Sequence, residues 1–162
     1  MNYEIVVASS NRHKVQEIRK ILSPHKMTVY GLCDLNIDEK EIIEDGNNYQ
    51  ENALIKANAY AHEINKPIIA DDSGIEIDAL NGKPGLESAR FAASMGGHDK
   101  AIEYIIEQVK KTGINTARFI CSIVLVNEEN KPKEEILDNF GLFLLKSLTK
   151  ALTCGWKRAF PN

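Results

Sequence analysis

The sequence predicts an α/β protein with a mixed central sheet flanked by helices. The order of its segments indicates the α/β class, while its length, composition and lack of a long apolar run indicate one globular domain. Short apolar segments typical of strands alternate along the chain with segments whose apolar residues recur at helical spacing. The chain has 162 residues, 43% hydrophobic and 27% charged, which suits one globular domain with a sizeable core. No apolar run is long enough to span a bilayer, so we expect no membrane partner.

The N-terminal part of the chain contains two expected strands with a helix between them. Residues 4–8 suit a strand, and a helix is expected over residues 12–22. The apolar residues of that helix fall on one face: Val15, Ile18, Ile21 and Leu22. Pro24 limits the helix at its C-terminal end, and a second strand is expected near residues 27–31.

The clearest helix lies in the segment GNNYQENALIKANAYAHEI, residues 46–64. Asn48 and Glu51 resemble a capping box at its start, with Asn in the place of Ser or Thr. Asn52 and Lys56 lie one turn apart and are expected outside the buried stripe. That stripe is expected to consist of Ala53, Leu54, Ala57, Ala61 and Ile64.

The later segments continue the alternation of strands and helices. Residues 68–70 and 75–78 suit two short strands, and NGKPG, residues 81–85, is typical of a turn. A helix is expected over residues 99–111, and TARFICSIVLV, residues 116–126, predicts a strong strand. The expected buried residues of that helix are Ile102, Ile105, Ile106 and Val109.

Charge and cysteine usage exclude several classes of protein. A net charge of −3 argues against a surface that binds nucleic acid along the whole chain. Three scattered cysteines without CxxC spacing indicate reduced thiols, not a disulfide framework or a zinc site. The N-terminus lacks the basic segment and the long apolar run of a signal peptide. We therefore expect a cytoplasmic protein.

The segment ASSNRHK, residues 8–14, joins the first strand to the first helix. Free backbone N–H groups and the helix dipole favour an anion at such a helix N-terminus. Lys14 opposes the dipole in the first turn, and a bound phosphate would account for it. An ordinary cap at Asn11 with a solvated lysine explains the same residues.

Acidic residues gather in two segments. Glu41, Glu44 and Asp45 precede a glycine and suit either a solvated loop or oxygen ligands for Mg²⁺. Asp71 and Asp72 follow the strand at 68–70, and adjacent strand residues point to opposite faces, so the two acids must have different roles. A ligand site at a strand end and a turn built on Asp-Ser-Gly are both open interpretations.

Taken together, the motifs resemble the inosine triphosphate pyrophosphatase family over residues 3–125. The resemblance is carried by SSNRHKVQEI, EDGNNYQENALIKA, IADDSGIEIDALNGKPGLESARF and ARFIC, in that order. It implies two lobes around a nucleotide-binding cleft, and hydrolysis of ITP, dITP and XTP to the monophosphate and pyrophosphate. It also implies dependence on Mg²⁺ and a homodimer.

The resemblance assigns roles to individual residues. The segment that matches the family's phosphate-binding T-G-N-x-x-K comprises Ser9, Ser10, Asn11, Arg12, His13 and Lys14, with Asn11 and Lys14 the strict matches. Lys56 matches the helix lysine that approaches the phosphates, and Ser73 a serine that contacts substrate. Glu44 and Asp72 match the metal ligands, with Asp72 also acting on the attacking water. Asp71 is expected to brace the strand end. For Lys14→Ala we expect weaker triphosphate binding with little loss of stability.

Beyond Val126 the expected match ends. The family continues with a GFGYDP stretch and a Ser-His-Arg motif that recognise the base, and only Phe140-Gly141 corresponds. We therefore expect residues 1–126 to form the family-like domain and residues 127–162 to be an atypical segment, from truncation or a shifted reading frame. Two alternatives to an active enzyme of this family follow. One is a nucleotide-binding remnant of weak or no activity. The other is a septum-inhibitor-type nucleotide pyrophosphatase, whose A-S-x-S-P-R-R loop VVASSNRHK resembles.

Overall fold

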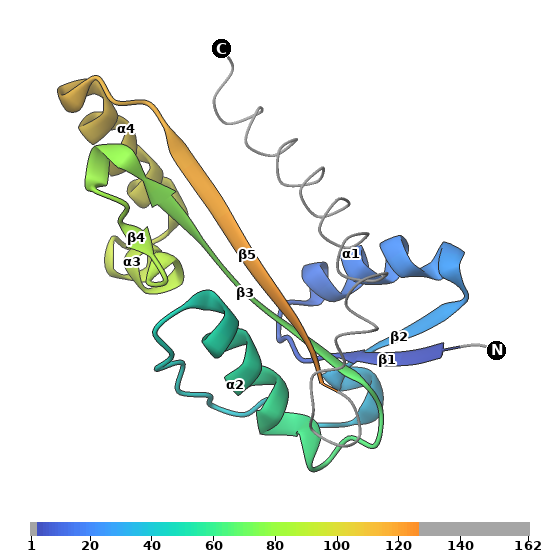
Figure 1. Ribbon diagram of the computed structural model, residues 1–162. Coiled ribbons are helices and arrows are strands. Elements are labelled where there is room, and N and C mark those ends of the chain that lie inside the picture. Colours follow the sequence, from blue (N-terminus) through green and yellow to red (C-terminus); the bar gives the residue numbers. More distant parts are fainter. Residues whose placement is uncertain (1–2, 127–162) are drawn as a thin grey trace. The chain divides into compact units, whose positions relative to one another are not determined.

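The computed structural model describes residues 3–126, which form two compact units (Figure 1). Of the described residues, unit 1 comprises 3–71 and 123–126, whereas unit 2 comprises Asp72–Ser122. Two long strands, β3 (Ile68–Ile77) and β5 (Ala117–Val126), contribute residues to both units. The expectations for residues 127–162 lie outside the described part of the chain.

Unit 1 confirms the strands and helices expected in the N-terminal part of the chain. Its elements are β1 (Tyr3–Val7), α1 (Arg12–Leu22), β2 (Met27–Gly31) and α2 (Tyr49–Ala61), with short 3₁₀ helices at Ser23–His25 and Leu32–Leu35. β1 pairs in parallel with β2 on one side and with β3 on the other. β4 (Pro84–Gly85) pairs with β3 in the antiparallel sense, so the sheet is mixed, as predicted.

The sheet of unit 1 packs a separate apolar cluster against each face. Alternation along β1 sends Ile5 and Val7 into one cluster and Val6 into the other. The first cluster also contains residues of α1, and the second contains residues of α2. Each fully buried aliphatic side chain contributes about 1.5–3 kcal/mol, so these two clusters hold α1 and α2 on opposite faces of the sheet.

The buried stripe of α2 differs from the predicted one. Ala53 and Ala57 are buried as expected, but Tyr60 takes the place expected for Ala61. Leu54 is 36% exposed, whereas Asn52, expected to point elsewhere, is only 2% exposed. Leu54 and Asn52 flank the alanine stripe on opposite sides, about 100° from Ala53 each way. The loop before the helix covers the flank that carries Asn52, and its Gly46 amide donates to the Asn52 side chain.

Unit 2 is built around a close contact between β3 and β4 (Pro84–Gly85). A Cβ on Gly74 would lie 2.2 Å from the Gly85 carbonyl oxygen, so only glycine allows the two backbones to approach this closely. Ser88 reinforces the contact, since its hydroxyl donates to the Gly85 carbonyl at 2.6 Å and accepts from the Ile75 amide at 2.9 Å. The predicted turn at residues 81–85 leads into β4, with Asn81 and Gly82 at positive φ.

The strands predicted at residues 68–70 and 75–78 are one continuous strand, so the Asp-Ser-Gly turn, one of the two interpretations left open for this segment, is not formed. β3 runs through Asp71, Asp72, Ser73 and Gly74 without interruption. Both carboxylates are buried, at 8% and 7% exposure, so neither could be left unpaired at low cost. Asp71 has Lys14 as a partner and Gly74 pairs closely with β4, which together favour an extended backbone over a turn.

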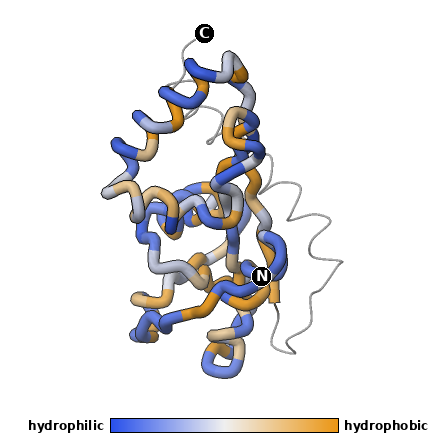
Figure 2. Tube along the Cα trace, turned by 90° about the vertical axis from the view of Figure 1, so that its left-hand side faces the viewer, coloured by the Kyte–Doolittle hydropathy of each residue, from blue (hydrophilic) through white to orange (hydrophobic). Residues whose placement is uncertain are grey.

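Two helices complete unit 2: α3 (Ser88–Ser94), which was not predicted, and α4 (His98–Thr112). The bounds of α4 match the expected helix, but its expected burial is wrong. Ala101 is buried and Ile102 is 44% exposed, while Ile105, Ile106 and Val109 are half-buried. Figure 2 shows hydrophobic and hydrophilic residues alternating within the helices, as amphipathic helices require. Within residues 3–126, no helix combines the length and apolar character needed to cross a membrane.

Candidate active site

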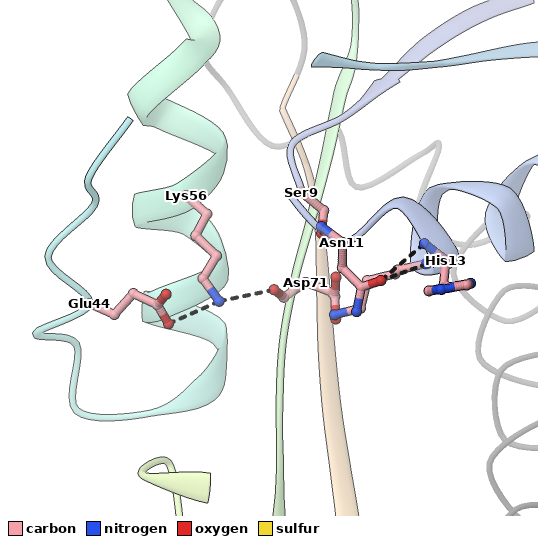
Figure 3. Close-up of polar contacts among 7 residues, drawn as sticks. Ser9, Asn11, His13, Glu44, Lys56 and Asp71 are labelled. Carbon is pink, nitrogen blue, oxygen red and sulfur yellow. Dashed lines mark hydrogen bonds and ion pairs between the residues drawn. The ribbon is translucent and has the colours of Figure 1, made fainter. Parts of the chain in front are cut away.

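The loop between β1 and α1 is organised by Asn11, the N-cap of α1. Its Oδ1 accepts from the backbone amides of His13 at 3.0 Å and Lys14 at 3.2 Å (Figure 3). The Ser9 hydroxyl in turn accepts from the Asn11 amide at 3.2 Å. The structure is therefore compatible with both interpretations of this segment. Asn11 caps the helix, and the helix N-terminus that it caps has a dipole that favours an anion. The side chains of Ser10, Arg12 and His13 are exposed.

Lys14 is paired with a buried carboxylate. Its Nζ lies 2.6 Å from Oδ2 of Asp71, where Asp71 is 8% and Lys14 30% exposed. The carboxylate offsets the unfavourable position of a cation in the first turn of α1. Asp71 does act as a brace, but from within a strand and toward α1, instead of at a strand end as predicted.

Lys56 on α2 contacts the same strand residue from another element. Its Nζ donates to the Asp71 backbone carbonyl at 3.3 Å and forms an ion pair with Oε2 of Glu44 at 2.9 Å (Figure 3). Two lysines, one from each helix, thus converge on Asp71, one on its side chain and one on its carbonyl. The lysines and the acid predicted to bind phosphate and metal are thereby linked within unit 1.

The loop that carries Glu44 lies along α2 and is held there by hydrogen bonds to two helix side chains. The Gly46 amide donates to Asn52 Oδ1 at 2.8 Å, and the Asn47 amide donates to Glu51 Oε2 at 2.7 Å. The capping pair predicted from the sequence is present, since Asn48 Oδ1 accepts from the Glu51 amide at 2.9 Å. The Asn47 backbone amide, followed by the Asn47 side chain, lowers the pKa of Glu51 below its usual value of 4.5.

Asn52 was missed as a residue of this site. Its polar side chain beside the buried Ala53 was the available signal, because a buried amide needs hydrogen-bond partners and the preceding loop could supply them. Helical spacing alone assigned it to a solvated flank.

Asp72 and Ser73 are the first two residues of unit 2. Alternation along β3 sends the side chain of Asp72 to the strand face opposite that of Asp71, as the sequence predicted. Asp72 is buried and Ser73 is half-buried.

The donor set at Glu44 suits a magnesium ion that arrives with a phosphorylated ligand. Mg²⁺ commonly takes one or two carboxylates and fills its other positions with water and phosphate oxygens. The carboxylate of Glu44 is 37% exposed and supplies oxygen donors of the right kind. Among residues 3–126, no three His, Cys, Asp or Glu side chains are grouped as metal ligands.

The fold and this site define a class of α/β protein in which lysines from two helices meet beside a capped helix N-terminus. The chain belongs to the Ham1 family, whose sequence profile matches residues 5–139. The match extends past Val126, where the sequence resemblance was expected to end.

Relatives with assigned activities are similar over most of this chain. A dITP/XTP pyrophosphatase of Bacillus subtilis is 38% identical over 143 residues, which cover 85% of this chain and 71% of the relative. One from Acholeplasma laidlawii is 41% identical over 128 residues, covering 79% of this chain and 62% of the relative. This chain therefore spans roughly two thirds of the length of the relatives it matches.

Solved structures show the same fold. A HAM1 protein from Coxiella burnetii superposes with a TM-score of 0.65 at 32% identity, covering 81% of this chain and 68% of that one. The Ham1 protein of Staphylococcus aureus superposes with a TM-score of 0.61 at 39% identity, covering 80% and 66%. These similarities confirm the predicted α/β class and the predicted family.

Proposed function

We propose that this chain hydrolyses non-standard purine nucleoside triphosphates, namely ITP, dITP and XTP, to the nucleoside monophosphate and pyrophosphate. The observation that carries the proposal is the convergence of Lys14 and Lys56 on Asp71 beside the N-terminus of α1. Two cations and a helix N-terminus suit the concentrated negative charge of a triphosphate. The activity named for the dITP/XTP pyrophosphatases above supplies the substrate class.

Substrate binding redirects Lys56 and adds a ligand to Lys14. Lys56 turns from the Glu44 carboxylate to phosphate oxygens, so its positive charge keeps a negative partner. Lys14 keeps its bond to the buried Asp71 carboxylate and donates its other ammonium N–H groups to the phosphates. Asp71 in β3 thereby fixes the position from which Lys14 reaches the ligand. The backbone N–H groups at the start of α1 add uncharged donors.

Glu44 and Asp72 are the proposed carboxylates for Mg²⁺, which when bound neutralises charge on phosphate oxygens. Asp72 is also the proposed base: its carboxylate accepts a proton from the water that attacks phosphorus. Ser73 is proposed to contact the substrate, as are the residues of the β1–α1 loop. A cytoplasmic homodimer belongs to the same proposal, and light scattering of the purified chain tests the dimer.

A substrate panel tests the proposed reaction. The chain is incubated with Mg²⁺ and ITP, XTP, dITP, GTP, ATP or UTP, and pyrophosphate release is measured. We expect ITP, dITP and XTP to be preferred, with activity abolished in Asp72→Asn. Release of phosphate instead of pyrophosphate, or full activity of Asp72→Asn, contradicts the proposal.

The two alternatives predict other outcomes in the same panel. A binding remnant would bind triphosphate without turnover, and a septum-inhibitor-type enzyme would prefer modified pyrimidine nucleotides. The relatives above carry the dITP/XTP pyrophosphatase name, which favours hydrolysis of non-standard purine triphosphates over both alternatives.

A further inference from the structure

Three contacts bind the loop at residues 44–47 to one flank of α2, and their order is regular. Glu44 pairs with Lys56, Gly46 donates to Asn52, and Asn47 donates to Glu51. As the loop runs forward from residue 44 to 47, its partners run backward along the helix from 56 to 51. The loop is therefore a strap laid along the helix, and we use strap for residues 44–47 below.

Gly46, in the middle of the strap, leaves no room for a side chain next to the helix. A Cβ at this position would lie 2.6 Å from Asn52 Oδ1, 2.7 Å from the Glu51 Cβ and 2.9 Å from the Asn52 amide nitrogen. Two of these atoms belong to the backbone or to the root of a side chain, so the helix could not yield easily. The strap thus keeps its path only with glycine here and an acceptor at Asn52.

The three contacts are not equivalent once a triphosphate binds. In the proposed reaction Lys56 moves from Glu44 to the phosphates, and the end of the strap that carries Glu44 loses its only contact among the three. The remaining two contacts must then hold Glu44 in place. Of these, the Gly46–Asn52 bond is the nearer to Glu44, and Asn52 is the buried partner, at 2% exposure.

We propose that Asn52 is a positioning residue: through the backbone of Gly46 it fixes the Glu44 carboxylate for the metal when Lys56 is engaged by phosphate. The inference rests on the proposed function, because it assigns Glu44 to the metal. It adds a residue that touches neither the metal nor the substrate. Groups that orient a ligating carboxylate in this way commonly change metal affinity about 10- to 100-fold when they are removed.

The test compares Asn52→Ala with Asn58→Ala. Asn58 is the matched control because it is the same residue type on the same helix, but exposed. Mn²⁺ is titrated by electron paramagnetic resonance into each protein saturated with an α,β-methylene analogue of ITP, which cannot be hydrolysed. We expect Mn²⁺ affinity to fall about tenfold or more in Asn52→Ala and to stay within about twofold in Asn58→Ala.

A second readout separates positioning from a general structural effect. Affinity for the same analogue in EDTA depends on the lysines and should change less than about twofold in Asn52→Ala. An equal loss of metal-free analogue affinity and Mn²⁺ affinity overturns the proposal, as does unchanged Mn²⁺ affinity in folded Asn52→Ala. Amide exchange at Gly46, measured by NMR without metal, should accelerate in Asn52→Ala and not in Asn58→Ala.

Gly46→Ala disrupts the same Gly46–Asn52 contact by a change in the loop and leaves Asn52 unchanged. It should reproduce the loss of Mn²⁺ affinity, so the proposal stays testable if Asn52→Ala does not fold. Unchanged Mn²⁺ affinity in folded Gly46→Ala overturns it. Wild-type protein that binds Mn²⁺ with the analogue but releases no pyrophosphate would refute the proposed function alone. Wild-type protein that binds no Mn²⁺ would refute this inference.

Discussion

Asp71 is the residue at which the two lysines of the site meet. Its carboxylate receives Lys14 and its carbonyl receives Lys56, so one strand residue is bound to both α1 and α2. A buried carboxylate of this kind is costly when its partner is removed, because the remaining charge keeps its desolvation penalty. The sequence suggested a brace here but not its partner, since the pair is separated by 57 positions.

This pairing changes the expected outcome of Lys14→Ala. Loss of the lysine should weaken triphosphate binding and also lower the free energy of unfolding by about 1–3 kcal/mol, because Asp71 is left without its cation. Urea unfolding measures the loss. Lys20→Ala, on the exposed end of the same helix, is the control, with an expected loss below about 1 kcal/mol.

The double variant Lys14→Ala/Asp71→Asn tests whether the unpaired Asp71 carboxylate causes the stability loss of Lys14→Ala. Removal of the carboxylate should recover part of the lost stability, since an amide is cheaper to bury than an unpaired charge. Stability equal to that of Lys14→Ala alone would show that the ion pair is not what stabilises the contact.

At the scale of secondary-structure elements, most strands and helices of unit 1 could be predicted because their apolar spacing is regular. The observed bounds of α1 and β2 agree with the approximate ranges predicted for them. What failed depended on contacts from distant segments: β3 continues through two acids, and α2 buries the flank that the strap covers. Tertiary partners, which periodicity does not contain, decided both.

Two substitutions at Asn11 test independently whether this residue caps α1 and whether the N-terminus of α1 binds an anion. Asn11→Ala should lower the free energy of unfolding by about 1 kcal/mol, because the amides of His13 and Lys14 lose their acceptor. Asn11→Asp should keep that stability, since Asp caps as well as Asn, but should weaken triphosphate binding by charge repulsion. Thermal unfolding and a fluorescent-nucleotide titration measure the two effects. Undiminished nucleotide affinity in Asn11→Asp would argue against an anion at this helix end.

Acid should loosen the strap through Glu51. Its pKa lies below 4.5 in the folded protein because its ionised form accepts from the Asn47 backbone and then from the Asn47 side chain. The stabilisation is therefore present above about pH 4.5 and is lost as pH falls through the lowered folded pKa. The ¹⁵N–¹H shift of Asn47 should titrate with a midpoint below 4.5. In Glu51→Gln this titration should be absent, and its persistence would assign the effect to another group.

For the whole molecule, the family, the α/β class and the mixed sheet could be predicted from the sequence, because motif order and strand–helix alternation are properties of the chain. The pairing of each lysine with an acid could not be predicted, because Lys14–Asp71 and Lys56–Glu44 join segments that the fold alone brings together. The division into two units within β3 was not expected either.

The Lys56–Glu44 pair predicts that metal and triphosphate assist each other. Triphosphate that attracts Lys56 frees Glu44 for Mg²⁺, so binding of each should favour the other, by about 1–3 kcal/mol as in typical coupling between sites. Thermal unfolding with Mg²⁺ alone, the α,β-methylene ITP analogue in EDTA, and both together measures the coupling. The shift with both should exceed the sum of the separate shifts. Additive shifts in the wild type, or equal excess in Glu44→Gln, would contradict it.

The strap also limits how this part of the chain can vary in length. Surface loops usually accept inserted or deleted residues, because nothing holds their interior. Here each of the three contacts joins one strap residue to one residue of α2, as Glu44 pairs with Lys56 and Gly46 with Asn52. One extra residue between Gly46 and Asn52 would put a side chain where only glycine fits and carry Glu44 away from Lys56. The count of residues from Glu44 to Lys56 is thus as much a part of the site as their identities.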